Sequence, residues 1–288
     1  MSSILTNNSA MVALQTLKNI NSQLGKTQSD IATGKSVANA KDNAAVWAIS
    51  KVMETDQSAA KAIQSNLNVA DATVATGRNG AEQITDLLRE MKDLAIGATV
   101  STADFDKINT DIEAKFKQIA SVINGSQMNG VNLLSSAGGL SVVASLDRTN
   151  GTAETTANTI SVTGINLAGT LNIGIDPTDA ATFGVSTDYT AISNTATAAG
   201  AIETIEGMIE LAVQGAADLG SAGKRISDQA SFVGKLSDSL KSGIGSMVDA
   251  DMEEASARLQ ALQTQQQLGI QALSIANQGP SAVMSLFR

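Results

Sequence analysis

Cysteine and histidine are both absent from the 288 residues of this chain. Their absence removes disulfides, thiolate chemistry, imidazole bases and most transition-metal sites together. Aromatic residues make up only 2% of the sequence, and Trp47 and Tyr189 are the single tryptophan and the single tyrosine. Carboxylates remain the only plentiful acid–base groups, but a cleft for sugar cleavage would also need aromatic platforms beside them. We therefore predict that the protein is not an enzyme and holds neither a cofactor nor a metal.

Positive charge is also scarce, because 28 acidic residues against 19 basic residues give a formal net charge of -9. An acidic surface repels phosphate groups, so we expect neither a nucleic acid nor an anionic membrane as a partner. No stretch approaches the roughly 18 uninterrupted apolar residues that a membrane-spanning helix needs. The first residues contain no basic run and no apolar segment typical of a secretory signal. The sequence alone thus indicates a cytoplasmic protein, unless a dedicated channel exports it without a cleavable signal.

Helical periodicity is plentiful, and it is clearest at the two ends of the chain. Apolar and small residues recur there at alternating steps of three and four, as in a coiled coil. Gly34 is placed to end the first helix, and the acidic residues from Asp249 favour the start of the last one. Residues 277–280, Asn-Gln-Gly-Pro, predict the end of that last helix. The seams comprise Ala13, Leu17, Ile20, Leu24, Thr27 and Ile31 in the first helix, and Met252, Ala255, Leu259, Leu262, Gln266, Gly269, Leu273 and Ala276 in the last.

Both terminal seams are weak, since alanines fill several positions and Gln266 and Gly269 stand among the apolar ones. A helix of this kind needs a partner to stay folded. One interpretation is that the two termini pair and become ordered only when many copies of the chain pack together. The alternative is an ordinary hairpin closure of a helical bundle, and the periodicity does not separate the two. On the first interpretation the polymerisation seam consists of Leu17, Ile20, Leu24, Ile31, Leu259, Leu262, Gln266 and Leu273.

Two longer heptad tracts lie between the terminal helices, one at 53–98 and the other at 196–247. A heptad pattern sustained for this length predicts long coiled-coil helices. A shorter amphipathic helix at 105–123 follows a capping residue at Asp104. Because the two tracts match in length and flank the middle of the chain, we expect them to pack antiparallel, with the shorter helix alongside.

The middle of the chain has a different composition, rich in glycine, threonine, serine and asparagine. Short β-type runs at 140–146, 159–162 and 171–175 predict a small β region, and Pro177 marks a turn. The expected fold is mainly α, a long antiparallel helical coiled-coil bundle with the terminal helices paired and a small β-rich insertion. We expect a terminal coiled-coil domain at 1–40 and 250–288, a helical rod domain at 41–139 and 196–249, and a variable outer region at 140–195.

Two short motifs suggest chemistry that their surroundings disfavour. Gly34-Lys35-Ser36 imitates the end of a phosphate-binding loop, but position 29 is serine where that motif needs glycine, and a helix precedes it. The acidic residues between Asp249 and Glu254 lack the glycine and the ligand spacing of a calcium loop. We interpret the first motif as a helix end and the second as a helix start.

Several ordered motifs resemble those of bacterial flagellin. In the first half they are NSA at 8–10, AKDNAA at 40–45 and MNGVNLL at 128–134. In the second half they are ADLG at 217–220 followed by Arg225, DAD at 249–251, ANQ at 276–278 and SLFR at 285–288. The resemblance covers roughly residues 1–135 and 196–288 and leaves the middle of the chain unassigned. The C-terminal half looks like the alphaproteobacterial members of the family.

The resemblance implies a structural subunit that self-assembles into the helical flagellar filament, which works as a propeller. Family members leave the cell unfolded through the flagellar type III export channel, without a cleavable signal, and polymerise under a cap. The implied partners are further copies of the chain, an export chaperone, the filament cap and the hook-junction proteins. The implied location is the extracellular flagellum. Packing between copies would then supply the partner that the weak terminal helices need.

The resemblance also implies a segment for an innate immune receptor. Many flagellins are detected by a Toll-like receptor through part of the long rod helix, which here resembles LREMKDLAI at 88–96, with Arg89, Glu90 and Leu94. The family pattern has an arginine where this sequence has Glu90. A reversed charge at a contact residue opposes recognition, so we expect weak or absent receptor activation.

Two alternatives to a filament subunit follow from the same resemblance. A hook-filament junction protein shares the terminal helical design but forms a short adaptor zone, and the motifs at 128–134 and 217–225 favour flagellin over it. Some flagellins carry a metallopeptidase in the middle of the chain. That alternative is excluded, because the zinc motif of such an enzyme requires histidine.

Overall fold

The structure is a computed structural model, and it describes residues 7–135, 138–148, 155–176, 178–179, 183–184 and 186–286. Long helices dominate it, as the heptad tracts predict, and the strands form two small antiparallel pairs. The chain divides into two compact units, one made of Met1–Gln57 with Asp238–Arg288 and the other of Ser58–Ser237. The mainly α fold with a small β insertion is therefore confirmed.

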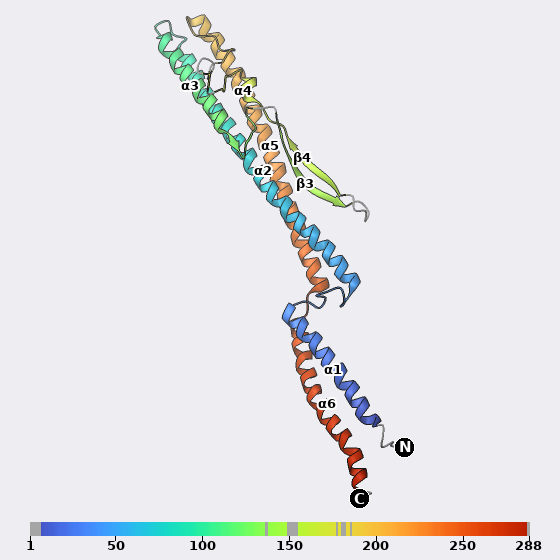
Figure 1. The fold of residues 1–288 in the computed structure, drawn as a ribbon. Helices are drawn as coiled ribbons and strands as arrows, with labels where there is room; N and C mark the ends of the chain where they lie inside the picture. The colour runs from blue at the N-terminus through green and yellow to red at the C-terminus, as the bar shows by residue number, and fades with distance from the viewer. Residues whose placement is uncertain are drawn as a thin grey trace. The chain divides into compact units, whose positions relative to one another are not determined.

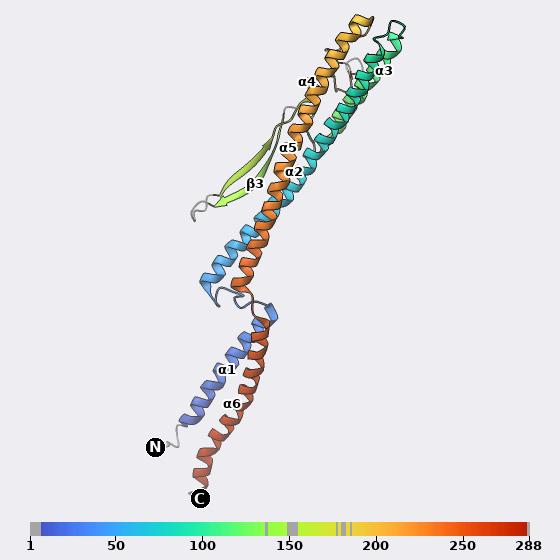
Figure 2. The same ribbon diagram turned by 180° about the vertical axis from the view of Figure 1, so that it is seen from behind.

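Helices α1 (Asn8–Thr33) and α6 (Met252–Leu286) lie side by side in the first unit (Figures 1 and 2). They run antiparallel, because the start of α1 meets the far part of α6 while the end of α1 meets the start of α6. Asn7 caps α1 by accepting a hydrogen bond from the backbone of Ala10. Asp251 caps α6 in the same way, accepting from the backbone N–H groups of Glu253 and Glu254. The acidic start of α6 is thus a helix cap, as the sequence predicts.

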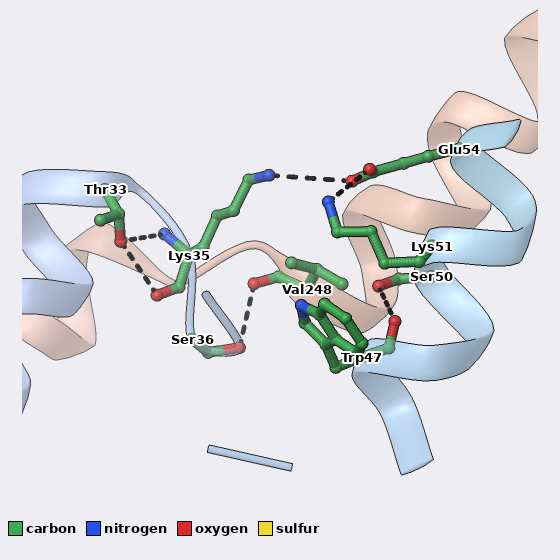
Figure 3. Close-up of polar contacts among 8 residues, drawn as sticks. All are labelled: Thr33, Lys35, Ser36, Trp47, Ser50, Lys51, Glu54 and Val248. Atoms are coloured by element: carbon green, nitrogen blue, oxygen red, sulfur yellow. Dashed lines mark hydrogen bonds and ion pairs between the residues drawn. The ribbon is translucent and has the colours of Figure 1, made fainter. Parts of the chain in front are cut away.

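Hydrogen bonds join the two connectors beside these helices, among them the bond from the Ser36 hydroxyl to Val248 O at 3.1 Å (Figure 3). Gly34 ends α1 in the left-handed conformation, with φ 68°, which glycine adopts without steric cost. Its carbonyl accepts from Ala250 N at 3.0 Å, while Ser36 donates to Val248 O through its backbone N–H at 2.8 Å. Lys35 N donates back to the Thr33 hydroxyl at 3.3 Å, and Val37 N joins Ser36 N in donating to Val248 O, at 3.4 Å. Gly34-Lys35-Ser36 is a helix end and a connector, and its backbone is not arranged as a phosphate loop.

Charged side chains cluster beside this junction (Figure 3). Lys51 Nζ lies 2.6 Å from Glu54 Oε2, and Lys35 Nζ lies 3.9 Å from Glu54 Oε1. The hydrogen bond from Lys51, together with the charges of both lysines, lowers the pKa of the Glu54 carboxyl. These pairs are open to solvent, so they orient the connector more than they stabilise it.

Most of helix α2 (Ala44–Gly97) and of helix α5 (Thr195–Val248) belongs to the second unit, where the two pack antiparallel (Figure 1). Lys92 Nζ pairs with Glu206 Oε1 at 2.7 Å, and further along the two helices Leu219 packs over Gly77. The residues of the predicted heptads form the interface. Those fully buried include Leu67, Val74, Ala81, Ile84, Leu88, Met91 and Ala95 of α2 with Ile205, Ala212, Leu219, Ile226 and Val233 of α5.

Helix α3 (Phe105–Gly125) packs alongside this pair, also as predicted (Figure 1). Asp104 caps it by accepting from Lys107 N at 3.3 Å. Its stripe of Ile112, Phe116, Ile119 and Ile123 is buried against the core that α2 and α5 form. A three-helix core accounts for how a chain with so few aromatic residues still buries a continuous apolar interior.

The Met128–Leu134 motif forms a tight hairpin between strands β1 (Gln127–Met128) and β2 (Val131–Asn132). Asn129 and Gly130 occupy its turn with φ 52° and 79°, the two positive values that a two-residue hairpin requires. Asn132 then ties the hairpin to the end of α3, donating to Ile123 O at 2.6 Å. The side-chain oxygen of Asn132 also accepts from Leu134 N at 2.9 Å. This asparagine therefore fixes the exit of the chain from the helical core.

Strands β3 (Leu140–Arg148) and β4 (Thr155–Val162) pair antiparallel beside α5 (Figures 1 and 2). Gln229 of α5 holds the hairpin by donating to Ala144 O at 2.9 Å. The predicted runs at 140–146 and 159–162 fall within these strands, which are longer than predicted.

The third predicted β run, at 171–175, is wrong. The chain forms a short helix α4 (Leu167–Thr170) and then only isolated bridges at Ile173 and Gly174. Asn166 and Asn172 are the reason, since both adopt left-handed φ values, 47° and 51°, that interrupt an extended chain. The turn predicted at Pro177 lies outside the described residues.

The predicted end of the last helix, at 277–280, is also wrong, because α6 continues to Leu286. A proline inside a helix removes one backbone hydrogen bond, the one to the carbonyl four residues earlier. That carbonyl belongs to Ala276, and it accepts a hydrogen bond from the Asn7 side chain at 2.8 Å. The helix therefore passes Pro280 with the freed carbonyl satisfied by the other terminus.

Candidate functional site

The seam residues of the two terminal helices face each other within one chain. In α1, Leu17, Ile20, Leu24 and Ile31 are half-buried, and Thr27 among them is buried. In α6, Leu262 is buried with 4% exposure, while Leu259, Gln266 and Leu273 are half-buried. All eight residues of the predicted polymerisation seam thus lie between α1 and α6, and their role in polymerisation stays a prediction.

Small and polar residues of the seam have specific partners. Gly269 lets α1 approach closely, since an added Cβ would lie only 3.2 Å from Leu17 Cδ1. Gln266 donates to the side-chain oxygen of Asn21 across the pair at 2.7 Å. Gly269 and Gln266 reduce the apolar contact in the seam. In return, Gly269 allows the two backbones to approach closely, and Gln266 forms a hydrogen bond between the helices.

Apolar side chains also point away from the seam on both helices. On α1, Met11, Val12 and Leu14 are exposed, and Val12 has 64% of its surface accessible. On α6, Leu268, Ile270 and Ile275 are exposed, and Ile275 reaches 71%. We call these six residues the outer apolar set: Met11, Val12, Leu14, Leu268, Ile270 and Ile275. Large apolar groups left in water on two adjacent helices indicate a surface that another molecule covers.

Charge is missing from the same part of the two helices. No charged residue occurs in α1 before Lys18, and none occurs in α6 after Arg258 up to Leu286. Such a surface loses little solvation when it is buried against a neighbour. The heptad analysis missed the outer apolar set because it followed one face of each helix. The signal was nevertheless available, as apolar residues off the seam in a stretch without charges.

The segment expected to meet an immune receptor lies on α2 in the other unit. Arg89 is exposed and pairs with Asp86 at 3.2 Å, while Leu94 packs partly against the core. Glu90 forms an ion pair with Lys115 of α3. The predicted receptor segment and the predicted polymerisation seam therefore belong to different units of the chain.

Other kinds of site find no support in the described part of the chain. It contains no group of acidic side chains arranged to hold a metal ion. Its helices likewise include none that combines the length and the apolarity of a membrane span. Other exposed apolar side chains, such as Phe232, occur elsewhere, but those of the outer apolar set lie on two adjacent helices in stretches without charge.

Comparison with known proteins points to one family over almost the whole chain. The bacterial flagellin N-terminal helical region matches residues 4–138, and the bacterial flagellin C-terminal helical region matches residues 202–287. Flagellin FljK of Caulobacter vibrioides is 38% identical over 100% of this chain and 99% of its own. A flagellin of Brucella melitensis is 39% identical over the full length of both chains. Flagellin C of Rhizobium meliloti is 34% identical, again over both full lengths.

Proposed function

The chain belongs to the bacterial flagellin family, and from this premise we propose that its paired terminal helices are the contact through which copies polymerise. The protein is a structural subunit of the extracellular flagellar filament and not an enzyme. Our proposal concerns which residues make the polymer. It assigns Leu17, Ile20, Leu24, Ile31, Leu259, Leu262, Gln266 and Leu273 to the contact within each subunit, and the outer apolar set to the contacts between subunits.

The outer apolar set is the observation that carries this proposal. Full burial of a large aliphatic side chain is worth about 1.5–3 kcal/mol relative to exposure in water. Six such side chains, exposed on the charge-free parts of α1 and α6, would favour association of neighbouring copies that cover them. Because the seam between α1 and α6 contains small and polar residues, the contact between these two helices within one chain contributes little stability by itself. We therefore expect this pair to gain most of its stability when copies pack around it.

The test is seeded polymerisation of the intact chain and of a truncation that lacks residues 1–34 and 250–288. Electron microscopy after addition of short filament seeds measures growth directly. We expect the intact chain to extend the seeds into long filaments and the truncation to add nothing. Growth of the truncation at the rate of the intact chain would overturn the proposal, and an intact chain that only caps the seeds would favour a junction protein.

Further assignments extend this proposal to the domains and the partners of the subunit. We assign residues 1–40 and 250–288 to the inner filament core, 41–139 and 196–249 to the rod domain, and 140–195 to the outer region. The family supports an export chaperone, the filament cap and the hook-junction proteins as partners. It also supports export through the flagellar type III channel without cleavage of a signal.

The Glu90–Lys115 ion pair supports poor recognition by the Toll-like receptor. A receptor surface that is complementary to an arginine at this position would instead meet the carboxylate of Glu90, which already pairs with Lys115. In a receptor reporter assay we expect far weaker activation than by a strong flagellin agonist at equal dose. The double substitution Glu90→Arg and Lys115→Glu, which keeps an ion pair but reverses it, should raise activation. Activation by the unchanged chain equal to the strong agonist would contradict this.

A further inference from the structure

Asn7 forms one hydrogen bond from each end of its side-chain amide. Its Oδ1 accepts from the backbone N–H of Ala10 at 3.1 Å, and this bond caps α1. Its Nδ2 donates to the carbonyl oxygen of Ala276 in α6 at 2.8 Å. A single side chain therefore starts one terminal helix and holds the other.

The carbonyl that Asn7 binds is chemically distinct from its neighbours. In a regular α-helix the oxygen of Ala276 would accept from the backbone N–H of residue 280. Residue 280 is proline, which has no N–H, and it is the only proline in α6. Proline thus creates a free acceptor at one place in α6, and Asn7 supplies the donor for it.

This pairing aligns α1 with α6 at the end of the pair that lies far from the connectors, where Gly34 and Ser36 already bind the backbone beside α6. Apart from the Gln266–Asn21 hydrogen bond and the buried Leu262, most of the seam consists of alanines, a glycine and partly buried aliphatic residues. Such residues tolerate sliding better than a core of interlocking large side chains. A shift of one helical turn, about 5.4 Å, would separate Asn7 from Ala276 and leave the carbonyl without either donor. Coiled coils can set their register by a polar contact across the pair, and the partly buried Asn7–Ala276 bond is such a contact.

We propose that Asn7 fixes the register of α1 against α6 at the end of the pair that carries the chain termini, acting on the carbonyl that Pro280 frees. The inference rests on the proposed function, because the register decides how the outer apolar side chains of the two helices line up for neighbouring copies. Asn7 is a positioning residue, since it acts through the alignment of other side chains.

A double-mutant cycle between Asn7 and Pro280 in the full-length chain tests this inference. Asn7→Ser keeps a good helix cap but loses the donor that reaches Ala276. Pro280→Ala restores the backbone N–H that Ala276 lacks. With Pro280 present, we expect Asn7→Ser to raise the critical concentration for seeded filament growth about fivefold. With Pro280→Ala, the same substitution should change it less than twofold.

Charge substitution gives a matched pair of variants for the same assay. Asn7→Asp keeps the capping oxygen but turns a second oxygen towards the Ala276 carbonyl, so we expect at least a tenfold rise in critical concentration. Asn8→Asp places the same charge one residue away, on the exposed first residue of α1, and should change growth less than twofold. Circular dichroism of the monomers at the same temperature controls for a loss of fold.

The outcomes separate this inference from the proposed function. An equal effect of Asn7→Ser with Pro280 and with Pro280→Ala would overturn the register role, since the effect would then not pass through the freed carbonyl. Unchanged growth of Asn7→Ser would overturn it as well, while failure of the terminal truncation to grow would still support the proposed function. A truncation that grows normally would overturn the proposed function, and the register role with it.

Discussion

Replacing Leu268 by aspartate is expected to abolish filament growth while leaving the monomer folded. Leu268 is 59% exposed in the single chain, so the substitution breaks no core within it. In the filament the same position would be covered by a neighbouring copy, and the carboxylate would be buried without a partner. Burial of an unpaired charge costs several kcal/mol, and each 1.4 kcal/mol changes an association constant about tenfold. We expect the critical concentration for seeded growth to rise at least about 100-fold.

Two further variants show whether the effect belongs to the proposed surface. Leu268→Gln removes the apolar group without adding charge, in a stretch that already holds glutamines at 265–267, and should give an intermediate effect. Ser141→Asp places the same charge on an exposed residue of β3, in the other unit, and should leave growth within about twofold. Normal growth of Leu268→Asp, or an equal loss in Ser141→Asp, would show that the outer apolar set is not the contact.

Replacing Phe116 by alanine should cause the largest loss of stability in the helical core. Phe116 is 2% exposed and packs on Tyr189 with the ring centroids 5.4 Å apart. Removing a buried phenyl ring typically costs about 3–5 kcal/mol, because a cavity remains where the ring was. For a unit of this size we expect the midpoint of thermal unfolding to fall by about 10 °C, measured by circular dichroism of the monomer.

The same substitution should also weaken the packing of the segment around Tyr189 against α3. Tyr189 donates to Asn109 Oδ1 at 3.0 Å, and burial, with a contribution from Glu113, raises the pKa of Tyr189 to about 12. The tyrosine therefore stays a neutral donor at ordinary pH. Phe232→Ala is the matched control, since Phe232 is 55% exposed and should cost less than about 1 kcal/mol. Equal losses from both substitutions would contradict the assignment of Phe116 to the core.

The heptad patterns predicted the long helices well because burial follows one period along them. The lines through Leu67, Leu88 and Met91 are buried at every turn from Ala60 to Ala98, and this burial outweighs the low helix propensity of Gly77 and Gly80. The seam of α1 and α6 was predictable for the same reason, down to the half-buried Gln266 and Gly269, except at Met252, which is 45% exposed. Where one regularly repeating apolar contact determines a helix, the helix can be predicted from the sequence alone.

The errors arose where a distant partner or a local backbone preference decided the outcome. Pro280 predicts a helix end, but Asn7, a residue far away in the sequence, donates the hydrogen bond that Pro280 cannot give to Ala276 O. The run at 171–175 has strand-forming residues, yet Asn172 takes a left-handed conformation within it. The outer apolar set was missed because its partner lies outside the chain. Residues that contact another copy lie outside the heptad positions that pack within one copy, so a search along those positions does not find them.

The most direct test of the account is the reactivity of a cysteine placed at Ile275. The natural chain has no cysteine, so the new thiol is the only group that a maleimide label reads. Ile275 is 71% exposed in the single chain, and we expect the thiol to react quickly in the monomer and at least about tenfold more slowly in seeded filaments. Ser141→Cys, on β3, should react at similar rates in both states. Equal reactivity of the Ile275→Cys thiol in monomer and filament would contradict the claim that the terminal helices pack against neighbouring copies.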